Sequence, residues 1–265
     1  MALALSLGKP SQAQSVVSTG QSFVTARMLP GIENENGTRT AGIRLTLAEG
    51  WKTYWRSPGE AGIPPNLDWS QSRNLAEAKI LWPRPELFVS FGMQTIGYSE
   101  SVVLPIAITP EDPGKAVHMH LTADFGVCKE ICVVERVELQ DILSPGMPAI
   151  GRSQIERALR QVPVPVSEAG VTEAVCAFSG QREAMQLSAT IAFQDDIRAA
   201  QVIVEGNDQL WLRRTQSRVE DGRIHVTAEA ELPPQVAWID RSAVRFTVLT
   251  ENTAVDIQGC TGPNG

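Results

Sequence analysis

Short apolar stretches that alternate with polar residues dominate the first part of the chain. The alternation is clearest over residues 117–123, where Val117, Met119 and Leu121 are separated by polar side chains. A period of two is typical of a strand with one buried face. Segments rich in Pro and Gly separate the runs and exclude long helices. β-type runs of this kind lie at residues 23–28, 42–47, 76–82, 101–108, 117–125 and 131–139.

The pattern changes in residues 145–166, where several prolines flank one helical segment. Ser153 and Glu156 have the spacing of a capping box, and Ile155, Leu159 and Val162 share one helix face. We therefore predict a short helical linker here. Residues 15–144 then form a first β-sandwich domain.

The β pattern resumes beyond the linker, and turn signals such as Gly206 and Gly222 separate the runs. A chain of 265 residues also exceeds what one small sandwich needs. We therefore predict a second β-sandwich over residues 167–265 and an all-β protein of two domains. Its β-type runs lie at residues 185–193, 200–204, 210–214, 223–231 and 243–249.

Composition narrows the class of protein. Apolar residues make up 43% of the chain and charged residues 20%, values typical of a globular protein. The net charge of −7 gives no basic stripe for phosphates, so nucleic acid is not an expected partner. No apolar run reaches the ~18–20 residues that cross a bilayer, and a soluble chain is expected.

The N-terminal segment, residues 1–14, resembles the end of a secretory signal, with a small-residue cleavage site after Ala13. The alternative is an ordinary flexible terminus. Export would place the protein in a compartment that permits disulfides.

The four cysteines fall two in each predicted domain. A bond between Cys176 and Cys260 would close a loop of about 85 residues, worth about 4–5 kcal/mol in the chain-entropy model. That size suits a structural disulfide. A bond between Cys128 and Cys132 would stabilise the fold by only about 2 kcal/mol in the same model, which is little for a structural disulfide.

The spacing of Cys128 and Cys132 constrains the local backbone. An uninterrupted strand would hold these residues about 13 Å apart, whereas a disulfide needs Cα atoms within ~4.4–6.8 Å. The chain must therefore turn between them, at a hairpin tip or in one helical turn. Either turn exposes the sulfurs to another protein, which predicts a redox-active dithiol. Lys129 favours a thiolate while Glu130 opposes it, as does Glu135, so the residues do not decide which sulfur is the nucleophile.

Two alternatives to a redox pair stay open. The cysteines could be buried free thiols or a minor structural bridge. They could also bind Cu(I) or Zn together with His118 and His120, which share one face of a strand. No third cysteine or further histidine lies in this half of the chain, so no metal site is expected.

Several segments together resemble the periplasmic N-terminal domain of the thiol:disulfide interchange protein DsbD and its ScsB relatives. The likeness spans approximately residues 20–142 and is weak in the predicted second β-sandwich. The segments are GWKTYWRSPGEAG at 50–62, WPRP at 82–85, GY at 97–98, LPI at 104–106 and ADFGVCKEIC at 123–132.

The resemblance implies a fold and a site. The fold would be an immunoglobulin-like sandwich, and the redox pair would be Cys128 and Cys132. Cys132 would form the mixed disulfide with a partner and Cys128 would resolve it. An aromatic cap loop would cover the pair, with Phe91 as the nearest match and Phe88 as the second.

The resemblance also implies a function. The pair would accept electrons from a membrane-embedded donor of the DsbD type and reduce oxidised periplasmic thioredoxin-like or isomerase proteins. This is the activity of a protein-disulfide reductase component, and no cofactor is expected. The family's membrane channel and thioredoxin-like domain have no counterpart in these residues, so a separate membrane protein would supply the electrons. The alternatives are a periplasmic copper-handling protein and a non-catalytic β-sandwich interaction module.

Overall fold

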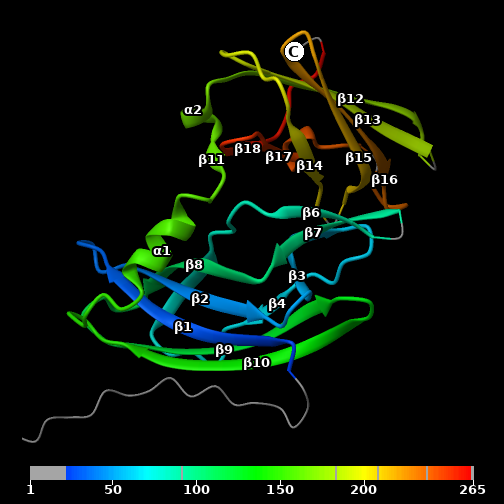
Figure 1. The fold of residues 1–265 in the computed structure, drawn as a ribbon. Helices are drawn as coiled ribbons and strands as arrows, with labels where there is room; N and C mark the ends of the chain where they lie inside the picture. The colour runs from blue at the N-terminus through cyan, green and yellow to red at the C-terminus, as the bar shows by residue number, and fades with distance from the viewer. Residues whose placement is uncertain (1–21, 91, 183, 208, 237, 264–265) are drawn as a thin grey trace, which may run out of the picture. The chain divides into compact units, whose positions relative to one another are not determined.

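Antiparallel sheets dominate the structure, a computed structural model that describes residues 22–263 except 91, 183, 208 and 237 (Figure 1). This architecture confirms the predicted all-β fold. The predicted signal segment, residues 1–14, lies outside the described residues. No helix in the described part of the chain has the length and apolar character that crossing a membrane requires.

Contacts divide the chain into two compact units. The first contains Met1–Thr53, Pro65–Leu81 and Ser99–Glu156, and the second contains Tyr54–Pro64, Trp82–Tyr98 and Arg157–Gly265. The division therefore passes through a strand, after Thr53.

The first unit is built from two sheets. One has the strand order β1-β2-β8-β5, and in the other β9 pairs with β10, β3 and β4. Alternate residues of β9 are buried from Val117 to Phe125, as the period-two pattern predicted. The strands that begin in this unit are β1 (Val24–Glu33), β2 (Arg39–Leu47), β3 (Lys52–Gly59), β4 (Asn66–Asp68), β5 (Leu75–Ile80), β8 (Ser101–Pro110), β9 (Val117–Cys128) and β10 (Cys132–Leu143).

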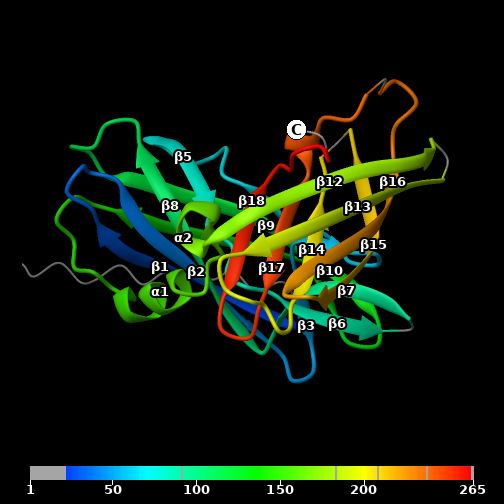
Figure 2. The same cartoon turned by 90° about the horizontal axis from the view of Figure 1, so that it is seen from above.

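The second unit contains the rest of β3 with the β6–β7 hairpin, and two further sheets. These have the orders β11-β18-β17-β14 and β12-β13-β16-β15, and the strands of the latter run side by side in Figure 2. Both contribute to one apolar core around Leu187 and Phe246. The strands are β6 (Glu86–Ser90), β7 (Met93–Ser99), β11 (Val164–Pro165), β12 (Val171–Gln181), β13 (Ala184–Phe193), β14 (Gln201–Glu205), β15 (Trp211–Glu220), β16 (Arg223–Glu231), β17 (Arg245–Leu249) and β18 (Ala254–Gln258).

The helices are short and lie mainly in the predicted linker. They are α1 (Arg152–Leu159), α2 (Val166–Ala169) and the 3-10 helix η1 (Arg241–Ala243). α1 begins one residue before Ser153, so Ser153 lies inside the first turn rather than at the predicted N-cap. The amides of Gln154 and Ile155 donate instead to the Gly151 carbonyl. Ile155 is fully buried, in agreement with the predicted apolar face.

Candidate redox site

The β9–β10 hairpin brings Cys128 and Cys132 together. The two strands pair in unbroken antiparallel register from Leu143 opposite Val117 to Cys132 opposite Cys128. The chain reverses over the three residues between the cysteines, where the Lys129 amide donates to the Ile131 carbonyl at 3.1 Å. Of the two predicted turns, the chain therefore forms a hairpin tip. The Cα atoms of the cysteines lie 4.2 Å apart and their sulfurs are bonded.

The two cysteines differ in their surroundings. Cys128 ends β9 and is only 7% exposed. It pairs with Lys52 on β3, and the neighbouring Thr53 hydroxyl donates to the Gly126 carbonyl at 2.9 Å. Cys132 begins β10 and is exposed. An incoming thiol therefore meets the sulfur of Cys132 more readily than that of Cys128.

Two exposed apolar residues lie near Cys132 in the hairpin. Ile131, inside the cysteine ring, is 64% exposed, and Val134, two residues beyond Cys132, is 56% exposed. Exposed apolar side chains grouped around a reactive group are typical of a surface that contacts another protein. At the tip, exposed apolar side chains therefore lie close to Cys132 in the sequence, on both sides of it.

Two charged residues near the tip, Lys129 and Glu135, contact earlier segments of the chain. The Lys129 ammonium donates to the Glu49 carbonyl at 3.3 Å. The Glu135 carboxylate accepts from the Ser22 hydroxyl and the Phe23 amide, both at 2.7 Å. The sequence did not predict the hydrogen bond between the Phe23 amide and Glu135, because the two residues are 112 positions apart and no local pattern connects them.

A cross-strand ion pair supports the hairpin below its tip. Arg136 lies opposite Asp124 and donates two hydrogen bonds to its carboxylate, at 2.7 and 2.8 Å. These bonds and the Arg136 charge lower the pKa of Asp124 from its ordinary value. Because the Arg136 side chain is 66% exposed, the pair contributes little to stability and mainly favours this register.

The predicted cap residues lie in and after β6. Phe88 is half-buried and pairs with Thr95 of β7. Phe91 lies outside the described residues. The assignment of a cap to either phenylalanine stays a prediction.

The structure does not bring the histidines to the cysteines. His118 and His120 lie near the start of β9, and Cys128 ends it, so the strand separates His120 from Cys128 by about 26 Å. The His118 ring instead lies 3.4 Å from the Arg73 guanidinium. The described residues contain no group of three or more His, Cys, Asp or Glu side chains placed to hold a metal ion.

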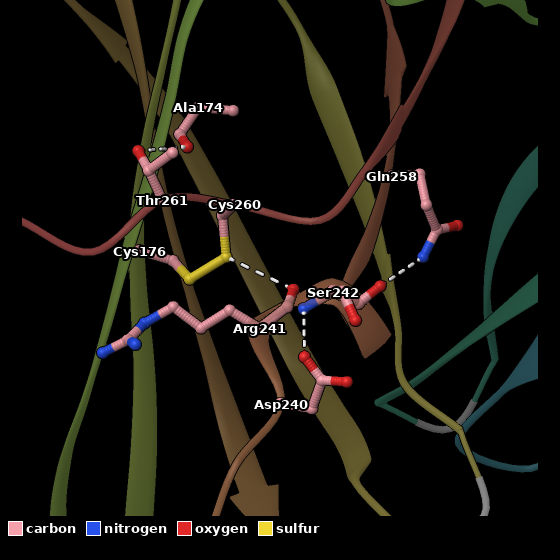
Figure 3. The surroundings of a disulfide bond; sticks show 8 residues. All are labelled: Ala174, Cys176, Asp240, Arg241, Ser242, Gln258, Cys260 and Thr261. Atoms are coloured by element: carbon pink, nitrogen blue, oxygen red, sulfur yellow. Dashed lines mark hydrogen bonds between the residues drawn. A yellow bond between two sulfur atoms is a disulfide. The ribbon is translucent and has the colours of Figure 1, made fainter. Parts of the chain in front are cut away.

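Cys176 and Cys260 are bonded in the second unit (Figure 3). Cys176 lies on β12 and is 1% exposed, while Cys260 follows β18. Backbone hydrogen bonds on either side reinforce the connection: the Cys176 amide donates to the Thr261 carbonyl and the Thr261 amide to the Ala174 carbonyl, both at 2.9 Å. The bond joins the segment after β18 to β12. That it serves stability alone stays a prediction.

The fold and site together define an all-β domain with a cysteine pair at an exposed hairpin tip. Residues 22–144 match the family model described as "Thiol:disulfide interchange protein DsbD, N-terminal". The sequence of this part of the chain is therefore similar to DsbD N-terminal domains, which confirms the resemblance found in its motifs.

A solved structure shows the same fold over most of the chain. The N-terminal periplasmic domain of ScsB from Proteus mirabilis superimposes with a TM-score of 0.74 at 22% sequence identity, covering 94% of this chain and 97% of that one. The likeness therefore extends beyond residues 22–144 into the second unit. No curated protein sequence matches the chain.

Proposed function

We propose that this protein is a thiol–disulfide exchange protein that receives electrons from a membrane-embedded donor of the DsbD type. It passes them to oxidised periplasmic thioredoxin-like or isomerase proteins. The observation that carries the proposal is the Cys128–Cys132 bond at an exposed hairpin tip of a domain similar to DsbD N-terminal domains. Exposed disulfides of this kind are the labile or catalytic ones, whereas structural disulfides resist reduction.

Reduction of the pair proceeds in two exchanges. A donor thiolate attacks Cys132 Sγ, the Cys128–Cys132 bond breaks, and Cys128 leaves as a thiolate that takes up a proton. The donor's second thiolate then attacks its own sulfur in the mixed disulfide and releases Cys132. Two electrons and two protons reach the pair, and the donor is left with a disulfide.

The reduced pair then acts on an oxidised acceptor. Cys132 attacks the acceptor disulfide and forms a mixed disulfide, releasing one acceptor thiol. Cys128 attacks Cys132 Sγ, which closes the ring again and releases the second acceptor thiol. The exposure of Cys132 and the burial of Cys128 support this assignment of roles. The exposed side chains of Ile131 and Val134 would contact the partner while the mixed disulfide exists.

The export signal predicted at the N-terminus supports a periplasmic location, as does the likeness to a periplasmic domain. Thiol–disulfide exchange by the cysteine pair needs no bound cofactor. By the family likeness, Phe88 or Phe91 would cover the reduced pair between partners and exclude small thiols.

Trapping of mixed disulfides tests the proposal directly. A Cys128→Ala variant keeps the attacking sulfur and lacks the resolving one, so it should accumulate covalent complexes with its partners. These complexes should appear on a non-reducing gel and disappear when the sample is first treated with dithiothreitol. A Cys132→Ala variant is the matched control, and it should trap far less because its remaining cysteine is buried. Equal trapping by both variants would contradict the assigned roles. No complex from either variant in a periplasmic extract would contradict the function.

A further inference from the structure

A cavity of about 350 Å³ opens on the surface of the second unit. This volume falls within the roughly 300–1,000 Å³ range of small-molecule sites. Its walls come from β12, β13, the segment after β16 and η1. The apolar lining residues are Phe178, Met185, Leu232, Trp238 and Ile239.

Two arginines are the charged residues of the lining, and no acidic side chain lines the cavity among the described residues. The Arg182 guanidinium donates to the carbonyls of Pro233 at 3.1 Å and Val236 at 2.8 Å. Arg182 therefore fixes the segment that leads to Trp238. In a chain of net charge −7, this apolar cavity is locally positive.

Arg241 supplies a guanidinium that is available to a ligand. It packs beside Gly262, and within the described part of the chain its side chain makes no hydrogen bond or ion pair. Figure 3 shows the Arg241 side chain running away from the Asp240 carboxylate, which accepts from the Ser242 amide at 2.9 Å. The neighbouring acid therefore does not neutralise it.

The second disulfide braces this cavity. Cys260 Sγ lies 3.9 Å from the Arg241 carbonyl oxygen, and its partner Cys176 is two residues before Phe178 on β12. The bond therefore ties together two walls of the cavity. Trp238 is 71% exposed, so its aromatic surface faces solvent beside the walls that the disulfide connects.

We propose that this cavity binds a carboxylate ligand with an apolar body. The apolar body packs against Trp238 and Phe178, which removes exposed aromatic surface from water. The carboxylate accepts charge-assisted hydrogen bonds from Arg241. The site is independent of the cysteine pair of the first unit.

Calorimetric titration of the oxidised full chain with octanoate, below its micellar concentration, tests the proposal. 1-Octanol and octyltrimethylammonium keep the apolar chain and replace the carboxylate by a neutral or a cationic head. Octanoate should bind saturably at one molecule per chain, octanol at least about tenfold more weakly, and the cation not measurably. Equal affinity for octanoate and octanol would overturn the proposal, as would the absence of saturable binding.

Variants locate the site. Arg241→Gln should weaken octanoate binding about tenfold, since it removes the charge and keeps a hydrogen-bond donor. Trp238→Ala should weaken octanoate and octanol alike. Arg218→Gln is the matched control, because Arg218 is an exposed arginine of the same unit outside the cavity, and it should leave binding unchanged.

Two results would reject the site. One is an equal loss for Arg218→Gln and Arg241→Gln, which would mean that octanoate responds to overall charge. The other is sedimentation that shows octanoate bound only by a dimer, which would assign the surface to a second copy of the chain. Thermal melting of each variant checks that it is folded.

Discussion

At the scale of single residues, the important difference is between two cysteines four positions apart. The sequence predicted a turn between Cys128 and Cys132, because the geometry of a disulfide demands one. It did not choose between a hairpin and a helical turn, nor between the two sulfurs. The hairpin depends on the long-range pairing of β9 with β10. The difference between the sulfurs depends on burial, because β9 buries Cys128 beside β3 while β10 leaves Cys132 exposed.

Asp141 gives a prediction of pH dependence. It lies on the inward-facing side of β10 between Leu139 and Leu143, which are buried, and burial raises its pKa above the ordinary value. A carboxyl with a raised folded pKa stabilises the fold below its unfolded pKa and loses that contribution as pH rises through the folded value. Asp141→Asn should therefore be more stable than the wild type at pH 7.

The gain should stay below about 1 kcal/mol, because the side chain is only half-buried and solvent screens its charge. Urea unfolding at several pH values checks this. The advantage of the Asn variant should grow from about pH 4 upward. An advantage that is the same at pH 3 and pH 7 would show that titration of Asp141 is not its cause.

At the scale of elements, the sequence predicted most long strands and missed those without an alternating pattern. Strands β8, β9 and β10 follow clear alternation or apolar runs. The alternation rule fails for β3, because Thr53, Tyr54 and Trp55 are buried in succession. It also missed β18, where the apolar run is too short to stand out.

The second half of β3 belongs by contacts to the second unit, and an ion pair shows why sequence could not reveal this. Arg56 donates to the Glu205 carboxylate on β14 at 2.9 and 2.8 Å. These side chains are 17% and 12% exposed, and 149 residues separate them. No local pattern predicts such a pair. The domain boundaries at residues 15–144 and 167–265 follow the local β pattern and the prolines of the linker, and they stay a prediction.

This ion pair gives a prediction at the same scale. Arg56→Ala leaves the largely buried Glu205 carboxylate without its partner and should lower the free energy of unfolding by about 3–5 kcal/mol. Replacement of both, Arg56→Met with Glu205→Leu, should cost less than the single change.

Urea unfolding measures both effects. Arg223→Ala is the control, because its pair with Glu173 is exposed and should cost under about 1 kcal/mol. If Arg56→Ala costs no more than Arg223→Ala, the pair is not a structural link of the second unit.

At the scale of the whole molecule, the two disulfides have separate predicted tasks in separate units. The Cys176–Cys260 bond spans 84 positions, and its loss should cost about 4–5 kcal/mol in the chain-entropy model. A Cys176→Ser/Cys260→Ser variant should therefore unfold at lower urea concentration, and with Cys128→Ala added it should still trap mixed disulfides through Cys132. Loss of mixed disulfides in a variant that remains folded would contradict this division of tasks.

The proposed function depends most on whether the Cys128–Cys132 bond opens and closes reversibly at physiological potentials. Equilibration of the Cys176→Ser/Cys260→Ser variant with glutathione buffers, followed by alkylation and mass measurement, gives the reduction potential of this couple without the second disulfide. The exposed tip predicts a reversible transition at a potential above about −300 mV. A pair that stays oxidised until well below that value would be an inert structural bond and would contradict the proposed function.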